Sequence, residues 1–391
     1  MCKGDLASPY SLDGEAVSLI TAFLFHAGSD DDPARLAVNS DKAFIGSYVL
    51  GMGFTFDDAD TQGVASPLSE MRRLITSDPC YQEVTFPYIG GEEVNSSPTH
   101  AYHRYVINFG ERDEEECRRR WPDLLSIVES KERVNRSRRG SIVNPERWWM
   151  FARPATDLYT AIGCLKRVLA ISRVSQAGAF VFLQTGMVYS EQLVIFAFDT
   201  WNAAAVLQSR VHDTWARFFS SSMKDDLRYT PSDCFETFPF PNAWESLEPL
   251  EAAGGEYYNF RSALMIRNGE GLTATYNRFH DPNERDSEIF ALRELHAAID
   301  RSVLDAYGWT DIPIACEFLL DYDPDEEGSG SRKKPWRCRW PDGVRDEVLA
   351  RLLALNAERA EAERLQLGDR GIKTDRNRAD LSSGALRLQE E

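Results

Sequence analysis

The hydrophobic residues of the chain follow two different spacings, and the change falls near Pro241. After this residue, apolar positions recur every three or four residues, which is the spacing of one face of an α-helix. The clearest case runs from Ile289 to Ala306. A last helix is predicted to begin near Val344. The pattern therefore predicts a mostly α-helical C-terminal domain over residues 243–365.

Before Pro241 the pattern is mixed, because short β-forming runs alternate with stretches of helical spacing. Two apolar runs, Ala179–Leu183 and Leu193–Phe198, are predicted to be buried strands. Another strand is expected to end near Ile89, in a Gly-Gly turn followed by a polar loop. The other predicted elements are a β-rich run at His103–Phe109, helices at Glu111–Val128 and Asn202–Phe219, and a helix with Thr156 as N-cap whose apolar face continues to Leu169. Residues 61–242 are thus expected to form a mixed α/β domain.

The two ends of the chain and its glycine-rich stretch have patterns of their own. Ala16–Phe25 is apolar but follows acidic residues, so it is predicted to be a helix and not a signal peptide. Gly51 and Gly53 are expected in a turn or a close-packed strand. No third glycine follows them, and the nearby aspartates would repel a phosphate. Residues 366–391 contain few large apolar side chains and are predicted to be a disordered tail.

Composition excludes several classes of protein. A hydrophobic content of 43% in 391 residues is enough for sizeable cores, and the net charge is −18. The longest apolar runs are far shorter than a membrane span, so no membrane partner is expected. The seven cysteines are scattered and form no Cys-x-x-Cys pair. This predicts free thiols in a reducing cytoplasm and disfavours a zinc site or a disulfide framework.

One segment is basic, although the whole chain has a negative net charge. Between Arg118 and Arg153 there are ten Arg or Lys residues and four Asp or Glu residues, a balance of +6. Nine of the ten are arginines, whose planar fork binds phosphate or a guanine edge in a bidentate manner. A solvated basic loop is the alternative interpretation. The candidate residues for contacts with double-stranded DNA are Arg133, Asn135, Arg136, Arg138, Arg139 and Arg147. Lys166, Arg167 and Arg173 are second-rank candidates, since they are expected to continue the basic character along the next helix.

Two further patterns in this segment allow alternatives. Asp123, Glu129 and Lys131 imitate the carboxylates and lysine of a nuclease metal site, but that chemistry needs them on adjacent strands around one metal ion. Here they fall within a single helix or loop. Trp148 and Trp149 could stack on bases, but adjacent tryptophans of this kind are more often part of a hydrophobic core. No complete active site is found among the motifs of the chain.

Nine short fragments carry a resemblance to a known family. In order, they are Phe44–Phe54, Phe86–Asn95, Arg104–Phe109, Pro145–Trp149, Leu207–Trp215, Cys234–Pro241, Gly271–Asn277, Leu292–His296 and Asp305–Trp309. Together the fragments resemble the MmeI-like (type IIG/IIL) group of fused restriction-modification and adenine-specific DNA methyltransferase proteins. In that group, a nuclease domain and an S-adenosylmethionine-dependent methyltransferase domain precede a target-recognition domain, and a helical domain follows.

The resemblance implies that DNA recognition and methyl transfer belong to different domains. Residues 61–242 would be the target-recognition domain. Residues 1–60 would be the edge of a methyltransferase core, with Ala16–Phe25 and Phe44–Phe54 docking onto it. The family's cofactor loop and its Asn-Pro-Pro-Tyr tetrapeptide have no counterpart in the 391 residues. No cofactor is therefore expected on this chain, and S-adenosylmethionine is expected on a separate methyltransferase subunit, with or without a nuclease.

Two functional hypotheses follow from these observations. The first is a sequence-specific DNA-recognition component of an adenine methyltransferase or restriction-modification system, whose catalytic half is a separate chain. The second is a folded, non-catalytic remnant of a truncated methyltransferase gene. A self-sufficient nuclease that uses Asp123, Glu129 and Lys131 is a third reading, which the spacing of these residues disfavours.

Overall fold

The computed structural model describes residues 10–12, 15–17, 20, 32–138, 145–220, 227–320 and 336–367, and for residues 12, 15, 134–138 and 367 it describes the backbone alone. Packing divides the chain into two compact units. The first unit contains residues 1–46, 88–103 and 155–360, and the second contains residues 47–87, 104–154 and 361–391. This division follows packing, so the predicted domain limits at residues 60, 242 and 365 stay predictions.

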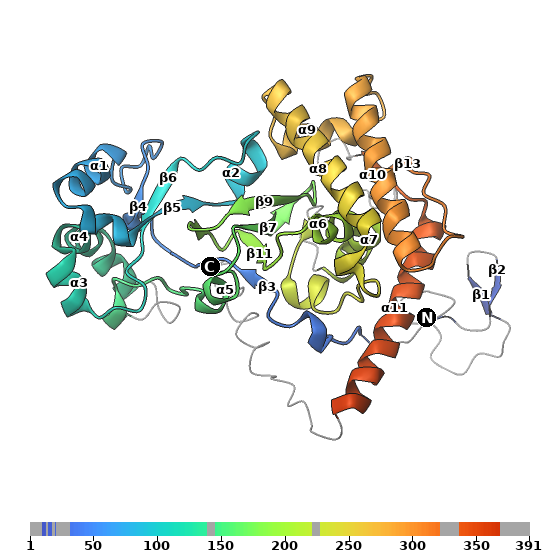
Figure 1. The fold of residues 1–391 in the computed structure, drawn as a ribbon. Coiled ribbons are helices and arrows are strands. Elements are labelled where there is room, and N and C mark those ends of the chain that lie inside the picture. The colour runs from blue at the N-terminus through green and yellow to red at the C-terminus, as the bar shows by residue number, and fades with distance from the viewer. Residues whose placement is uncertain are drawn as a thin grey trace. The chain divides into compact units, whose positions relative to one another are not determined.

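A four-stranded antiparallel sheet lies at the centre of the first unit (Figure 1). Its order is β3 (Ala43–Ile45), β11 (Leu193–Phe196), β7 (Arg167–Ser172) and β9 (Phe180–Gln184). Every residue of β11 is buried, as is every residue of β7 after Arg167. Consecutive buried positions point to opposite faces of a strand, so both faces of the sheet are covered. The two predicted buried strands are confirmed.

Shorter strands complete the β-structure of this unit. The last two residues of β5 (Thr85–Ile89) pair in parallel with β10 (Val188–Tyr189). The remaining pairs are antiparallel: β1 (Tyr10–Leu12) with β2 (Glu15–Val17), β8 (Val174–Ser175) with β12 (Leu227–Arg228), and β13 (Glu317–Leu320) with β14 (Trp336–Arg339). The predicted helix at Ala16–Phe25 begins in strand β2 instead, and most of its length lies outside the described residues.

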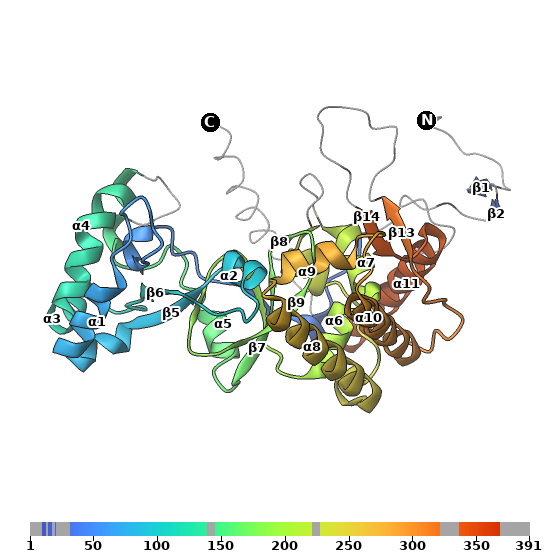
Figure 2. The same ribbon diagram turned by 90° about the horizontal axis from the view of Figure 1, so that it is seen from above.

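Helices make up the rest of the first unit. They are α2 (Gly91–Ser96), α5 (Thr156–Ala161), α6 (Trp201–Gln208), α7 (Arg210–Phe219), α8 (Glu248–Asn268), α9 (Leu272–Phe279), α10 (Ser287–Ala306) and α11 (Asp342–Leu367), with the single turns η1 (Ala37–Asn39), η6 (Pro231–Phe235) and η7 (Trp244–Ser246). Helices α8 and α10 lie side by side (Figures 1 and 2). Gly254 lets α8 approach α6 closely, since an added Cβ would lie 2.3 Å from the carbonyl oxygen of Trp201. The predicted fold class, a mixed α/β region followed by a mostly helical one, is confirmed.

Three local predictions for this unit are wrong. The predicted Asn202–Phe219 helix is interrupted at Ser209, whose extended backbone (ψ 156°) starts α7 as its N-cap. The helix predicted from Thr156 ends at Ala161, and Leu169 lies in strand β7, because the β-forming run outweighs the helical spacing. The polar loop expected after Ile89 is helix α2. Its first turn is closed by the Glu93 carboxylate, which accepts a hydrogen bond from the N–H of Gly90 at 2.9 Å.

Two buried asparagines hold the ends of the first unit together. On α11, the Asn356 side chain donates to the carbonyl oxygens of Ala34 and Thr237 at 2.8 and 2.7 Å, and it accepts from the N–H of Ala34. Asn39 donates to the carbonyl oxygen of Phe238 at 2.8 Å. These bonds satisfy backbone groups of extended segments that have no sheet partner, which a buried chain requires.

The second unit is smaller and mainly helical. Strands β4 (Thr55–Phe56) and β6 (Arg104–Ile107) pair in antiparallel fashion. Around them are helices α1 (Leu68–Ser77), α3 (Glu114–Arg120) and α4 (Pro122–Arg138), and the turns η2 (Met52–Phe54), η3 (Pro79–Val84) and η5 (Pro145–Arg147). Its core contains large aromatic side chains that are fully buried, among them Phe54, Phe56, Phe109 and Trp121.

Candidate DNA-recognition surface

The basic segment of the second unit is built on the consecutive helices α3 and α4. Asp113 caps α3 by accepting a hydrogen bond from the N–H of Glu116 at 2.7 Å. Trp121 ends α3 with φ −134° and ψ 57°. Its buried indole N–H donates to the carbonyl oxygen of Cys80 at 2.8 Å, and Pro122 then opens α4. The single helix predicted over Glu111–Val128 is therefore two helices separated by a buried tryptophan.

Helix α4 continues through Arg138, so the loop predicted after Val128 is wrong for this part of the chain. Glu, Lys and Arg favour helices, and this propensity extends α4 although the stretch has little apolar periodicity. Four candidate residues therefore lie on a helix: Arg133, Asn135, Arg136 and Arg138. The side chains of the last three, and all of Arg139, lie outside the described part of the structure.

Ion pairs neutralise part of the basic segment. Arg118 pairs with Glu114 at 2.7 Å and Arg120 pairs with Glu116 at 3.1 Å, both one helical turn away on α3. Arg133 pairs with Glu129, and its guanidinium lies 5.6 Å from the ring centre of Trp148. Since Glu114 and Glu116 precede the window that was counted in the sequence, its balance of +6 overstates the free positive charge.

Three described arginines of the segment are exposed without a side-chain hydrogen bond or ion pair to the described residues, and one of them, Arg153, lies over the ring of Tyr48 at 5.2 Å. Arg119 on α3 and Arg147 on η5 are exposed, and neither side chain has a hydrogen bond or ion pair with the described residues. An unpaired, exposed guanidinium keeps its full capacity for a phosphate or a base edge. Arg147 is therefore the described candidate of this segment that is best placed for DNA contact.

The tryptophans that follow Arg147 belong to the core. Trp148 and Trp149 are 3% and 8% exposed and meet edge to face, with ring centres 5.8 Å apart. The indole N–H of Trp149 donates to the carbonyl oxygen of Arg112 at 2.9 Å. This confirms the core interpretation over base stacking. The pair fixes the backbone from which Arg147 projects.

The last three candidate residues lie in the first unit and differ in their surroundings. Lys166 is exposed. Arg167 donates twice to the carbonyl oxygen of Asp199, and its guanidinium lies 4.0 and 4.2 Å from the ring centres of Phe182 and Trp201. Arg173 donates to the carbonyl oxygen of Glu191 at 3.1 Å. Arg167 and Arg173 are thus engaged within the protein, whereas Lys166 is accessible.

The glycine pair near the start of the second unit surrounds a buried carboxylate. Glu132, on α4, is 1% exposed and accepts a hydrogen bond from the N–H of Gly53 at 2.9 Å. A Cβ at Gly51 or Gly53 would lie 2.4 or 2.7 Å from atoms of Glu132. The close-packed interpretation explains both glycines. The Glu132 side chain fills this loop, so its residues do not fit the phosphates of a nucleotide cofactor.

The residues that imitate a nuclease site do not converge. Asp123 accepts a hydrogen bond from the hydroxyl of Tyr81 at 2.6 Å, Glu129 pairs with arginines, and Lys131 donates to Ser66 at 2.7 Å. Burial lowers the pKa of Lys131. The three side chains lie on one helix and face different partners, so they hold no common metal ion. Across the described residues, no group of three His, Cys, Asp or Glu could bind a metal.

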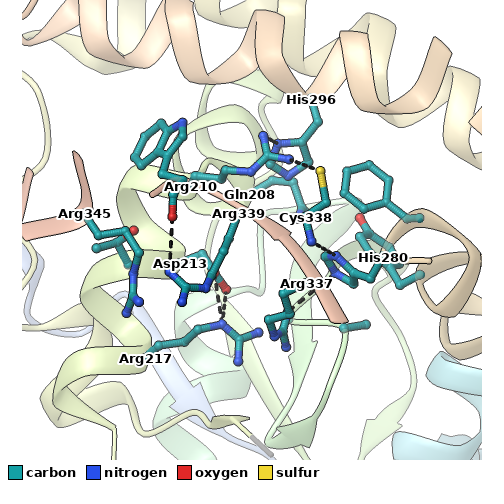
Figure 3. Close-up of a pocket in the computed structure, with 16 residues that line it drawn as sticks. Gln208, Arg210, Asp213, Arg217, His280, His296, Arg337, Cys338, Arg339 and Arg345 are labelled. Carbon is teal, nitrogen blue, oxygen red and sulfur yellow. Dashed lines mark hydrogen bonds and ion pairs between the residues drawn. The ribbon is translucent and has the colours of Figure 1, made fainter. Parts of the chain in front are cut away.

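An arginine-lined pocket in the first unit was missed by reasoning from the sequence. Its cavity has a volume of about 60 Å³ (Figure 3). Arg210 and Arg217 lie two turns apart on α7, and Arg337 and Arg339 alternate along β14. Spacings of seven on a helix and two on a strand are the signals that could have found it. Either spacing alone is weak evidence for a site, and more than a hundred residues separate the arginine pair on α7 from the pair on β14.

A mixed α/β region followed by helices is the organisation that the resemblance noted in the sequence implies. The comparison with protein families gives the same class. Residues 52–242 match the family described as MmeI, target recognition domain. This part of the chain is a target recognition domain of the MmeI kind, and the resemblance noted in the sequence is confirmed.

A solved structure extends the likeness beyond that domain. The chain is similar to the type IIL restriction-modification enzyme MmeI solved in complex with DNA, with a TM-score of 0.55 over 89% of this chain at 17% sequence identity. At that identity the likeness shows the fold. The chain spans 39% of the length of that enzyme. No curated protein matches the sequence. No described helix is long and apolar enough to cross a membrane.

Proposed function

We propose that this protein recognises a specific sequence in double-stranded DNA as the target-recognition component of an MmeI-like restriction-modification system. The observation that carries the proposal is the match of residues 52–242 to the MmeI target recognition domain. The likeness in fold to an MmeI enzyme solved with DNA supports it. Because the chain has a net charge of −18, its contact with DNA must be local.

The DNA contacts are proposed to come from the end of α4 and from η5. Arg147 is exposed on η5, and Arg133, Asn135, Arg136 and Arg138 lie along α4. Arginines that neutralise phosphates release counterions and make binding depend on salt. Arginine or asparagine that reaches a base edge adds discrimination between sequences. Lys166 is a further accessible cation, in the first unit.

Methyl transfer is proposed to reside on a separate subunit. Methylation of an adenine amino group needs a bound methyl donor and a polar loop that holds the flipped base. Asn-Pro-Pro-Tyr does not occur in the 391 residues, and the Gly51-x-Gly53 loop is filled by Glu132. S-adenosylmethionine would therefore bind to the partner. Val49 and Phe54 are already buried within this chain, which leaves the exposed Met52 as the apolar docking residue of that stretch.

Methyl transfer by a reconstituted pair tests this division. The purified chain is incubated with labelled S-adenosylmethionine and a plasmid, with and without the product of the adjacent upstream reading frame. We expect transfer by the mixture alone, confined to one sequence motif. Transfer by the chain by itself would contradict the assignment of catalysis to a partner. Transfer by the partner to the same motif without this chain would contradict the recognition role.

A further inference from the structure

The first unit contains another cavity, with a volume of about 320 Å³. It lies between η1, the chain that follows β11, the residues in and before η7, and the C-terminal half of α11. It shares no lining residue with the arginine-lined pocket, and none of the candidate DNA contacts lines it. Sites for small molecules begin at about 300 Å³, so the cavity is large enough for one small ligand.

Three aromatic side chains line this cavity and contact one another. The rings of Phe240 and Trp244 are stacked, with centres 4.9 Å apart and planes 26° apart. The ring of Phe198 meets Trp244 edge to face at 5.5 Å. Phe240 and Trp244 are buried in the core, which holds the rings in place. This aromatic wall offers dispersion contacts to a flat ring of a ligand.

Asn39, on η1, brings an unused hydrogen-bond acceptor to the cavity. The residue is 4% exposed, and its amide nitrogen donates to the carbonyl oxygens of Phe238, Phe235 and Glu236 at 2.8, 3.2 and 3.3 Å. These three contacts fix which way the amide points. Asn39 Oδ1 accepts no hydrogen bond from the residues that the structure describes. Because Asn39 lines the cavity, a ligand that donates an N–H to Oδ1 would satisfy an enclosed polar atom.

A lysine side chain brings positive charge to the same cavity. Lys42 Nζ lies 5.9 Å from the ring centre of Phe198 and 3.8 Å from the Glu245 carboxylate. The Glu245 side chain is 64% exposed, so water screens its attraction for Lys42. The ammonium group makes no side-chain hydrogen bond with a described residue. Lys42 can therefore pair with an anionic group of a ligand that lies against the aromatic wall.

The three features together restrict the ligand. A flat ring suits the aromatic wall, an N–H donor suits Asn39 Oδ1, and an anionic group suits Lys42. A nucleotide combines them, because its base stacks on aromatic rings, the amino group of adenine, cytosine or guanine donates, and its phosphate is anionic. We propose that the cavity binds one nucleotide whose base carries an exocyclic amino group, with the base against the aromatic wall and the phosphate toward Lys42. The proposal rests on this cavity and not on the recognition function proposed above.

Calorimetric titration with adenosine monophosphate, at constant ionic strength, tests the cavity. We expect one site per chain. Purine riboside monophosphate, the same molecule without the amino group, should bind about tenfold more weakly, because Asn39 Oδ1 stays without a donor. This pair of ligands tests the Asn39 contact without a substitution at a buried residue. Ribose phosphate, which lacks the base, should show no binding.

A substitution at Lys42 locates the phosphate. Lys42→Gln should weaken binding of adenosine monophosphate about fivefold and leave binding of adenosine, which has no phosphate, unchanged. Lys166→Gln is the matched control, because Lys166 is an exposed lysine of the same unit that does not line the cavity. It should leave both affinities unchanged.

Competition with a single-stranded oligonucleotide distinguishes two sources of the nucleotide. If the oligonucleotide displaces adenosine monophosphate, the ligand is an unpaired nucleotide within a strand. If it does not, the ligand is a free nucleotide. Both results support the cavity. Wild-type protein that binds adenosine monophosphate no better than ribose phosphate would overturn the proposal. Equal affinities for the ligands with and without the amino group, or an unchanged affinity for adenosine monophosphate in Lys42→Gln, would also overturn it.

Discussion

Single residues decide what the glycine stretch and the basic segment can do. From the sequence, Gly51 and Gly53 were distinguishable from a cofactor loop by the missing third glycine. Glu132, whose side chain packs against both glycines, lies 79 residues after Gly53. Nothing in the sequence around Glu132 predicts this contact. Likewise, the sequence shows that Arg167 is basic, but it does not show that the guanidinium lies against Phe182 and Trp201. Contacts between residues far apart in the sequence could not be predicted, because the spacing of hydrophobic residues reports on local structure.

The contact between Gly53 and Glu132 predicts a stability effect. In Gly53→Ala, the new methyl group would lie 2.7 Å from Glu132 Cγ and Lys131 Cβ, atoms close to the backbone of α4 that cannot rotate away. We expect the free energy of unfolding to fall by about 1–3 kcal/mol, measured by denaturant titration. Gly343→Ala is the control, since nothing lies within 4 Å of its added Cβ. Equal stability of the two variants would contradict the packing described for this loop.

Substitutions at the neighbours Lys166 and Arg167 should separate an effect on DNA binding from an effect on the free energy of unfolding. Arg167→Ala removes two hydrogen bonds to Asp199 and two ring contacts, so we expect a loss of about 2 kcal/mol in unfolding free energy. Lys166→Ala removes an exposed cation and should change stability by less than about 0.5 kcal/mol. Lys166→Ala should instead flatten the salt dependence of DNA binding. A stable Arg167→Ala variant with impaired DNA binding would show that Arg167 contacts DNA directly.

At the scale of elements, periodicity located most helices and strands, and single residues interrupted them. The long run at Ile289–Ala306 predicted α10 within two residues. Trp121 divides one predicted helix because its indole donates to the distant carbonyl oxygen of Cys80. Ser209 divides the other because its side chain caps α7 by accepting a hydrogen bond from the N–H of His212. The interruption at Ser209 also turns the N–H of Arg210 toward Asp300 at 2.8 Å. The break at Trp121 depends on a tertiary partner, which helix propensity does not record.

The α4–η5 segment should bind DNA as one element. Replacing Arg136, Arg138 and Arg139 together by Ala should weaken duplex binding, and each lost phosphate contact should flatten the log–log salt slope by about 0.9. Arg147→Ala should act in the same direction. If Arg147 reads a base, its loss should cost roughly 1–3 kcal/mol at the cognate site alone. The matched control is Arg118→Ala, because Arg118 is ion-paired within the unit. Unchanged binding by the triple variant would exclude this element.

At the scale of the whole molecule, buried histidines should set the response to acid. Burial lowers the pKa of His212 to about 4, and burial with Arg210 also lowers the pKa of His296. Both bind a proton more readily when unfolded, where the pKa is about 6.5. Stability is therefore complete above pH 6.5 and falls as the pH drops toward the folded pKa. Each histidine contributes up to about 1.4 kcal/mol per pH unit.

Comparison of the wild type with His212→Gln checks this response. The variant should be less stable at pH 7, because it loses the hydrogen bonds to Leu207 and Tyr229. Its unfolding free energy should also fall less steeply between pH 6.5 and 4.5. The same slope in both proteins would show that His212 takes up no proton on unfolding.

The central claim is that this chain selects a DNA sequence, and selection from a randomised duplex pool tests it most directly. The purified chain is equilibrated with the pool at physiological salt, and the bound fraction is sequenced and re-bound. We expect the recovered duplexes to share one motif, bound about a thousandfold or more tightly than the starting pool. A bound fraction as random as the input would contradict target recognition by this protein.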